Sequence, residues 1–247
     1  MLRLPSFYAP ERDCPYLPGR MARMHYALAG QLTHAEYLRL MLAGWRRFGQ
    51  MLFRPECPAC QECRSLRIRV QEFREERRHR RNRKVNQDIQ LRIGTPQVSD
   101  AKLELYDRYH AAQAQSKGWP THPPKDAEEY AQAFVYQPFA VEEWCYYLGE
   151  RLVGVGYVDP LHCAPPDLVG QEGLSAIYFF WEPQLRERGL GTWNVLCLID
   201  SARARKLPYV YLGYHVEGSP SMAYKPTFRP NDRHEPDGQW REFRGTK

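Results

Sequence analysis

The sequence of 247 residues lacks the long apolar segments of a membrane protein. No apolar run reaches the roughly 18 residues that a membrane-spanning helix needs. The pattern of a targeting signal, charged and then apolar, is also missing, because Pro5 interrupts the first residues at once. Internal repeats and low-complexity segments are absent as well. We therefore expect a monomeric, cytoplasmic protein of one large domain or two modest ones, without a membrane partner.

Disulfide bonds are not expected either. The chain has seven cysteines, an odd number, and the cytoplasm keeps thiols reduced. The motif Cys57-Pro-Ala-Cys60-Gln-Glu-Cys63 places three thiols on consecutive tight turns. Thiolates so spaced can converge on one zinc ion or one iron–sulfur cluster, and Cys14 is the natural fourth ligand. The alternative is that these cysteines are packing or redox residues, and the sequence does not choose between the metals.

Excess positive charge is absent outside one stretch of the chain. The net charge is +6, yet residues 64–84 hold ten arginines and lysines against three glutamates, so the remaining residues sum to about −1. A concentrated basic stripe predicts a polyanionic partner. Arginine dominates the stripe, and guanidinium groups bind phosphate as a fork. We expect phosphate contacts from Arg77, Arg78, Arg80 and Arg81, whereas the alternative is a solvated charged helix.

A β-α-β unit is the clearest structural pattern in the sequence. Residues 174–181 are apolar and aromatic, which predicts a buried strand. Gly189 and Gly191 then predict a turn, followed by a helix to about Arg205 and a second strand over 207–214. The crossover is expected to be right-handed. The helix N-terminus at the glycine turn is suited to a phosphate or a polarised carbonyl, whereas the alternative is a tight turn without a ligand.

Other segments predict further elements. A capping box at Thr33–Glu36 begins a helix that Gly49 ends, with Arg46 and Arg47 off its packing face. The first thirty residues predict loops. The remaining expected elements are a strand over 64–70, helices from Ser99 to Lys117 and from Asp126, and a hairpin of strands 141–148 and 152–158. Together these elements predict an α/β fold with a mixed sheet and flanking helices.

Several motifs in this order resemble one family. They are residues 14–20, the cysteine motif after Phe53-Arg54-Pro55, Leu190-Gly191-Thr192, residues 207–214 and residues 224–230. Together they are similar to the aminoacyl-tRNA–protein transferases, in the bacterial aspartate/glutamate leucyltransferase branch, which are relatives of the eukaryotic arginyltransferases. The resemblance spans the chain from about Phe7 to Pro230. It departs from the eukaryotic pattern at Leu17, where those relatives have a second cysteine.

The resemblance implies transfer of leucine or arginine from aminoacyl-tRNA to proteins that begin with Asp or Glu, which creates a degradation signal. It also implies a small cysteine-rich N-terminal domain, which we place at residues 1–72. A GNAT-like acyltransferase domain follows at residues 73–247, with the basic, tRNA-facing segment at its start. No organic cofactor is expected. The cysteines of eukaryotic relatives hold an iron–sulfur cluster, and the matching residues here are Cys14, Cys57, Cys60 and Cys63.

The chemistry of this transfer indicates candidate site residues. The donor ester is already activated and the attacking α-amine has a pKa of about 7.7–8.0, so much of the acceleration can come from holding the two together. Amides beside Gly191 are candidates to stabilise the oxyanion, and Asp159 is a candidate acceptor for the amine. The other candidates are Tyr178 for catalysis, Arg188, Lys225 and Arg229 as cations for the acidic acceptor, and Gly189, Asn194, Tyr211, Tyr214 and Tyr224 for tRNA or substrate. The three tyrosines of this set can stack on bases or pack in the core.

Two other functions compete with this interpretation. An acetyl-CoA-dependent GNAT N-acetyltransferase explains the glycine turn but explains neither the basic stripe nor the cysteines. A metal-stabilised nucleic-acid-binding module explains the cysteines and the charge but leaves the β-α-β unit without a role. We therefore expect the aminoacyl transferase, which accounts for all three features.

Overall fold

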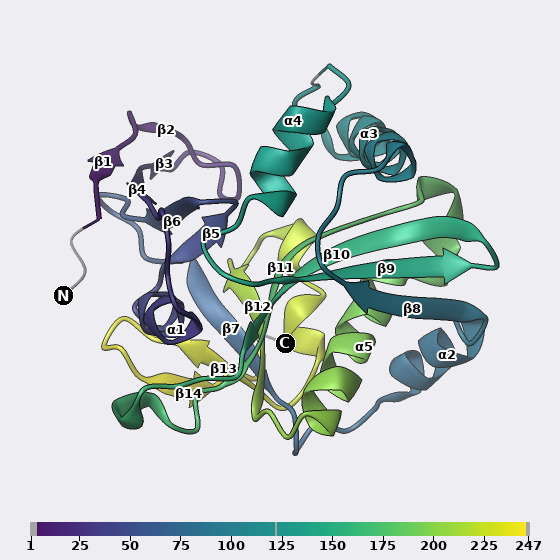
Figure 1. Ribbon diagram of the computed structural model, residues 1–247. Helices are drawn as coiled ribbons and strands as arrows, with labels where there is room; N and C mark the ends of the chain where they lie inside the picture. The colour runs from purple at the N-terminus through teal and green to yellow at the C-terminus, as the bar shows by residue number, and fades with distance from the viewer. Residues whose placement is uncertain (1–3, 122, 246–247) are drawn as a thin grey trace.

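The computed structural model describes residues 4–121 and 123–245 as a mixed α/β protein (Figure 1). A larger sheet has eight strands in the order β14-β13-β7-β12-β11-β10-β9-β8, and a smaller one has four in the order β1-β4-β6-β5. Strands β2 and β3 form a separate pair. The prediction of a mixed sheet with flanking helices is confirmed. Among the described helices, none is both long enough and apolar enough to cross a membrane.

The strands of the large sheet come from both halves of the sequence. They are β7 (Arg64–Arg69), β8 (Ile89–Gly94), β9 (Glu142–Leu148), β10 (Arg151–Leu161), β11 (Gly173–Trp181), β12 (Tyr209–His215), β13 (Asn231–His234) and β14 (Trp240–Glu242). Strand β7 precedes residue 72 but pairs with β12 and β13 in the middle of this sheet. The division of the chain at residue 72 stays a prediction, and it does not coincide with a boundary between the two sheets.

The predicted β-α-β unit is present as β11, α5 (Leu190–Ala204) and β12. Strands β11 and β12 are the parallel pair of the large sheet, and their pairing covers three positions, from Gly173 opposite Tyr209 to Ser175 opposite Tyr211. Gly173 permits this close approach, because a Cβ there would lie 2.4 Å from the carbonyl oxygen of Tyr209. Beyond Ser175, β11 continues along β10 to Trp181, whereas β12 continues along β7. The two strands therefore separate toward their carboxyl ends.

Helices cover both faces of the large sheet (Figure 1). One face packs against α5, which lies beside α2 (Arg77–Val85). The other face packs against α3 (Asp100–Lys117) and against α4 (Ala127–Tyr130), which continues as a π-helix over Ala131–Val135. The predicted ends of α3 are confirmed, with Ser99 as N-cap and Gly118 at a φ of 66° as C-cap. Short 3-10 helices span Pro166–Leu168, Pro183–Arg188, Pro220–Met222 and Lys225–Thr227.

Twelve of residues 4–30 lie in four short strands and the rest are turns, bends or irregular chain, so the prediction of loops there was wrong in part. The strands are β1 (Ser6–Tyr8), β2 (Arg12–Asp13), β3 (Met21–Ala22) and β4 (Met24–Leu28). The prolines at 15 and 18 lie between β2 and β3, where the chain does turn. Strand β1 is only three residues long and becomes regular by pairing with β4, a partner sixteen or more residues away. Such short strands carry too little alternation to be seen in the sequence.

The helix predicted from the capping box begins as expected but ends earlier. Thr33 and Glu36 form the reciprocal capping box of α1 (His34–Leu42). The chain leaves the helix before Gly44, whose φ is +90°, and returns as β5 (Arg46–Phe48) and β6 (Met51–Pro55). The predicted end at Gly49 was therefore wrong. Gly49 instead lies in the hairpin turn between these two strands.

Arg46 and Arg47 are buried in β5, which contradicts their predicted place off a helical packing face. The side chain of Arg47 is 2% exposed and forms an ion pair with Asp159 of β10, whose side chain is 0% exposed. Its Nε donates to Asp159 Oδ2 at 3.1 Å, a second guanidinium N–H donates to Asp159 Oδ1, and Nη1 donates to the carbonyl of Gly49 at 3.1 Å. This pair joins the small sheet to the large one.

We predict that Asp159→Asn lowers the free energy of unfolding by about 3 to 5 kcal/mol, because it leaves the buried Arg47 cation without a counter-charge. The matched control is Asp167→Asn, since Asp167 also binds an arginine in a fork, Arg39, but both side chains are 57% exposed. There the change should be much smaller, because water screens an exposed pair. Denaturant unfolding measures both, and equal losses would show that the buried pair does not hold the two sheets together.

Candidate functional site

A cavity of about 950 Å³ lies against the small sheet and is the candidate functional site. Its wall is built from β3 to β6, the segments around Cys14 and Cys57–Cys63, the end of β12 and residues 234–236. All four cysteines of the predicted ligand set line this cavity. The structure thus brings together sequence motifs that are more than forty residues apart.

The four thiols are close enough to influence one another. Burial raises the pKa of Cys63 to about 12, and the neighbouring Cys57, Cys14 and Cys60 add to that shift. A guanidinium N–H of Arg20 donates to Cys60 Sγ at 3.3 Å, and the backbone amide of residue 23 donates to Cys57 Sγ at 3.5 Å. Within the described residues, however, no three His, Cys, Asp or Glu side chains are grouped tightly enough to hold a metal ion. The cysteines share a cavity wall without converging on a centre.

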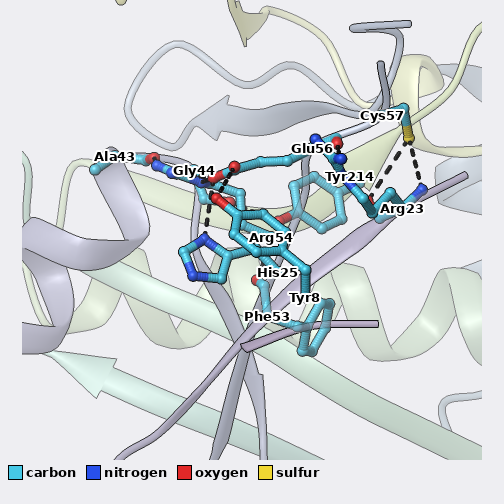
Figure 2. A network of polar contacts seen from close by, with 10 residues as sticks. All are labelled: Tyr8, Arg23, His25, Ala43, Gly44, Phe53, Arg54, Glu56, Cys57 and Tyr214. Carbon is cyan, nitrogen blue, oxygen red and sulfur yellow. Dashed lines mark hydrogen bonds and ion pairs between the residues drawn. The ribbon is translucent and has the colours of Figure 1, made fainter. Parts of the chain in front are cut away.

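The carboxylate of Glu56 is the centre of a polar network beside this wall (Figure 2). It accepts hydrogen bonds from Tyr8 Oη at 2.8 Å, Arg54 Nε at 2.9 Å and His25 Nδ1 at 3.2 Å. Burial alone would raise the pKa of Glu56, but these three partners outweigh it and lower the pKa to about 2. Glu56 therefore stays ionised and ties β1, β4 and β6 together next to Cys57. Sequence reasoning missed this residue, because two of its three partners, Tyr8 and His25, are distant in sequence.

Tyr214 lies where the large sheet meets the cavity. Its Oη donates to the carbonyl of Gly44 at 2.5 Å, and the guanidinium of Arg46 lies 5.1 Å from its ring centroid (Figure 2 shows the first contact). Behind it, Lys225 Nζ donates to the carbonyl of Tyr214 at 2.5 Å. Burial, together with the charge of Arg46, lowers the pKa of Lys225 to about 8. Two of the predicted substrate-binding residues, Tyr214 and Lys225, are therefore adjacent.

Three predicted site residues are buried and occupied by internal contacts. Tyr211 is 0% exposed and its Oη donates to the carbonyl of Gln171 at 2.7 Å. Of the two predicted roles, stacking on bases and packing in the core, the structure therefore supports packing in the core. Asn194 is buried on α5 and accepts from Tyr146 Oη at 2.8 Å. Asp159 is held by Arg47, as described above. Burial argues against direct substrate contact by any of the three, and it gives Asp159 a positioning role in place of an acceptor role.

Tyr178 lies in an aromatic cluster between β11 and the helices that cover it. Its Oη is 2.8 Å from His110 Nε2, a partner on α3 that the sequence did not indicate. Burial raises the pKa of Tyr178, so the phenol is protonated and able to donate. Phe48 of β5 contacts its ring edge-on, with the centroids 5.6 Å apart. Because Phe48 also lines the cavity, Tyr178 lies directly behind the cavity wall.

The glycine turn is packed against the basic helix α2. Gly189 is the N-cap of α5 with a φ of +63°, and Asn82 Nδ2 of α2 donates to the carbonyls of Arg188 at 2.9 Å and Gly189 at 3.1 Å. The guanidinium of Arg188 is bound in a fork by Asp88, at 2.7 and 3.0 Å. A Cβ on Gly191 would meet no atom within 4 Å. The four singled-out arginines are exposed on α2 and are Arg77, Arg78, Arg80 and Arg81.

The structure thus distributes the candidate residues over two surfaces. Helix α2, against which the glycine turn packs, lies at the lower right of Figure 1, whereas the small sheet, which lines the cavity, lies at the upper left. Arg229 and Tyr224 are exposed, Tyr224 by 44%. The guanidinium of Arg229 donates to the backbone carbonyl of residue 244 at 2.6 Å. The basic helix and the cysteine cavity are therefore separate sites on one molecule.

Comparisons with known proteins agree on one family. Residues 12–81 match the family model for the N terminus of arginine-tRNA-protein transferase, and residues 101–235 match the model for its C terminus. The aspartate/glutamate leucyltransferase of Helicobacter hepaticus is 34% identical over 93% of this chain and 91% of its own. That of Alkalilimnicola ehrlichii is 37% identical over 93% of this chain and 92% of its own. Among solved structures, L-PGS from Bacillus licheniformis aligns with a TM-score of 0.44 and 11% identity, covering 83% of this chain and 68% of that one.

We predict opposite changes in stability when Gly189 and Gly191 of the glycine turn are each replaced with alanine. Gly189→Ala should destabilise the protein by about 1 to 2 kcal/mol, because a Cβ is strained at positive φ. The new Cβ would also lie 2.9 Å from Asn82 Nδ2, which holds α2 against α5. Gly191→Ala, the matched control, should be neutral or stabilising by up to about 1 kcal/mol, since it lies within a helix and has space. Thermal unfolding checks both, and equal effects would contradict the packing of α2 on the turn.

Proposed function

The chain belongs to the arginine-tRNA-protein transferase family, and from this membership we propose the reaction that it catalyses. It transfers an amino acid, leucine or arginine, from aminoacyl-tRNA to the N-terminal amine of proteins that begin with aspartate or glutamate, which marks them for degradation. One observation carries the proposal, namely that relatives named aspartate/glutamate leucyltransferase match more than nine tenths of the chain at 34–37% identity. The donor makes the cytoplasm the natural location, and we propose that the enzyme acts as a monomer.

The chemistry asks the protein mainly to position two reactants. The amine attacks the ester carbon of the donor, the C–O bond to the tRNA 3′ oxygen breaks with its electron pair on that oxygen, and the proton that the amine loses passes to the same oxygen. Because the ester is already activated, holding the two groups together supplies much of the acceleration. The amide of Gly191, beside α2, and the protonated phenol of Tyr178, behind the cavity wall, are alternative candidates to stabilise the oxyanion, because they belong to different surfaces. No organic cofactor is required by these steps.

We propose the finer fold assignment, a GNAT-like acyl-transfer domain, from the β11-α5-β12 unit. Its support is the short parallel pairing, the separation of the strands beyond Ser175, and the glycine turn that opens α5. The cysteine-rich N-terminal domain is proposed from the cavity that Cys14, Cys57, Cys60 and Cys63 line. These thiols are the proposed ligands of a zinc ion or an iron–sulfur cluster, and they must draw closer together to hold it. A bound metal would tie the first cysteine segment to the second.

The acidic side chain of the acceptor requires a cation. Of the three predicted cations, Arg188 already binds Asp88 in a fork. Lys225 can act only as a point charge, whereas an arginine can bind a carboxylate with two parallel bonds. Arg229 is exposed and is therefore the preferred candidate. Discrimination against Asn and Gln is expected where the bound substrate shields Arg229 from water, because an amide would then leave this cation without its counter-charge.

Transfer assays with the purified full-length protein test the proposed function. Labelled leucine or arginine from its tRNA should appear on peptides that begin with Asp or Glu, and about a hundredfold less on peptides that begin with Asn or Gln. Incorporation of label from acetyl-CoA in place of aminoacyl-tRNA would favour the acetyltransferase. No transfer from either donor would overturn the proposal. Zinc and iron should be measured on the same preparation, purified without oxygen. If neither metal is present at a near-stoichiometric level, the cysteines have a packing or redox role.

The exposed arginines of α2 are proposed to contact tRNA phosphates. Replacing Arg77, Arg78, Arg80 and Arg81 with alanine should weaken tRNA binding and reduce its salt dependence by about one unit of slope for each lost phosphate contact. Arg39→Ala is the control, because Arg39 is exposed and binds Asp167, and it belongs to α1, which lies far from α2 in Figure 1. Binding titrations over a range of salt measure the slope. An unchanged slope in the quadruple variant would move the phosphate contacts to another surface.

A further inference from the structure

The small sheet buries one face and leaves the other open. Ala27 and Leu52 point to the buried face and pack against α1, with exposed fractions of 3% and 0%. Their strand neighbours alternate to the opposite face, where Tyr26 and Phe53 are opposite each other and line the cavity. An antiparallel sheet usually places polar residues on its open face. Here that face carries aromatic rings, which indicates a ligand that covers them.

These rings form a row across three strands. Phe7 of β1 is opposite Tyr26 of β4, which is opposite Phe53 of β6. The rings of Phe7 and Tyr26 are stacked with centroids 5.4 Å apart and planes 24° apart. Phe53 continues the row into the cavity, where its ring meets Tyr214 edge-on at 6.3 Å. The row therefore runs from the outer edge, where Phe7 is 55% exposed, to the inner wall of the cavity.

The chemistry around the row favours a nucleic acid strand over an apolar ligand. Arginines 12, 23, 54 and 64 line the cavity together with glutamates 56, 62 and 235. Arg54 is paired with Glu56 and Arg64 with Glu235, so the guanidinium groups best placed for phosphate are those of Arg12, which forms no ion pair within the described residues, and Arg23, which lies 4.0 Å from Glu11. Guanidinium groups bind phosphate, while flat rings stack on bases of any sequence. A four-stranded sheet with aromatic rings on its open face is also a common platform for unpaired RNA. A paired stem hides its base faces, so only a single-stranded segment can use this row.

We propose that the row formed by Phe7, Tyr26 and Phe53 stacks the unpaired bases at the 3′ end of the tRNA donor. This inference rests on the proposed function, since it assigns that donor a binding surface. Phe48 lies on the same face, lines the cavity and touches Tyr178. On β5, Arg46 is opposite Phe53, and Phe48 lies two residues further along the same face. The inner end of the row is therefore close to Phe48, behind which the candidate catalytic tyrosine lies.

An uncharged RNA hairpin tests the stacking without requiring any transfer. One hairpin carries an unpaired 3′ ACCA segment with 2-aminopurine as its last base, and a second hairpin lacks the segment. Wild-type protein should bind the first hairpin more tightly and quench its fluorescence. Phe7→Leu and Tyr26→Leu, which keep apolar volume but lose the ring, should each weaken that binding about tenfold, reduce the quenching and leave binding of the second hairpin unchanged.

Leu28→Ala is the matched control, because Leu28 is 49% exposed on β4 but lies outside the cavity and offers no ring. It should change neither hairpin's affinity. Circular dichroism checks that each variant folds. Because Phe7 is highly exposed, Phe7→Leu should not impair folding. Equal binding of both hairpins by wild-type protein would overturn the inference.

Other outcomes assign the row differently or separate the two proposals. If the ring variants raise KM for the acceptor peptide but keep hairpin binding, the row belongs to the acceptor and the inference is wrong. If wild-type protein transfers leucine or arginine while the unpaired segment adds nothing to binding, the proposed function stands and the stacking fails. If the segment is bound and quenched but no amino acid is transferred, the stacking stands and the proposed function fails.

Discussion

The buried ion pair between Arg47 and Asp159 determines how the two sheets sit together. Both charges are withdrawn from water. The guanidinium of Arg47 binds the carboxylate of Asp159 in a fork, and its Nη1 donates to backbone and side-chain oxygens. Such a pair adds little net stability compared with well-packed apolar residues, but breaking it is costly. Its effect is therefore to specify geometry. It fixes the β5–β6 hairpin against β10, and this hairpin supplies Phe48 and Phe53 to the cavity wall.

A second set of contacts depends on that placement. With the hairpin fixed, Tyr214 at the end of β12 reaches the backbone of Gly44, and Glu56 gathers side chains from β1 and β4. The cavity wall is thus stabilised on the side of the large sheet by Tyr214 and on the side of the small sheet by Glu56. Because β12 leaves β11 after three paired residues, its end is directed to the cavity while β11 carries Tyr178 behind the wall. The strand separation and the cavity belong to one arrangement.

Sequence reasoning succeeded where the signals are local. The strand, glycine turn and helix of the β-α-β unit, the capping box at Thr33 and the glycine stop of α3 all depend on neighbouring residues, and all are confirmed. It failed after Leu42, where Trp45 and Phe48 continue a helical pattern although the chain forms a hairpin. The Gly-Gln pair between Phe48 and Met51 was the available signal. The burial of Arg47 could not be foreseen, because its partner is 112 residues away. The cysteines were foreseen as a group, but Glu56 was not.

The separation of the two surfaces has a physical rationale. Phosphate contacts supply affinity but carry no information about where the RNA ends. Charge on α2 can therefore hold a tRNA without placing its ester. Placement requires contacts to the unpaired end itself, on a surface rigid enough to keep reacting groups in attacking geometry. The small sheet meets that requirement, because its other face is buried against α1 and its hairpin is fixed through Arg47. Affinity and placement can then be tuned by different residues, which suits an enzyme whose two substrates are both macromolecules.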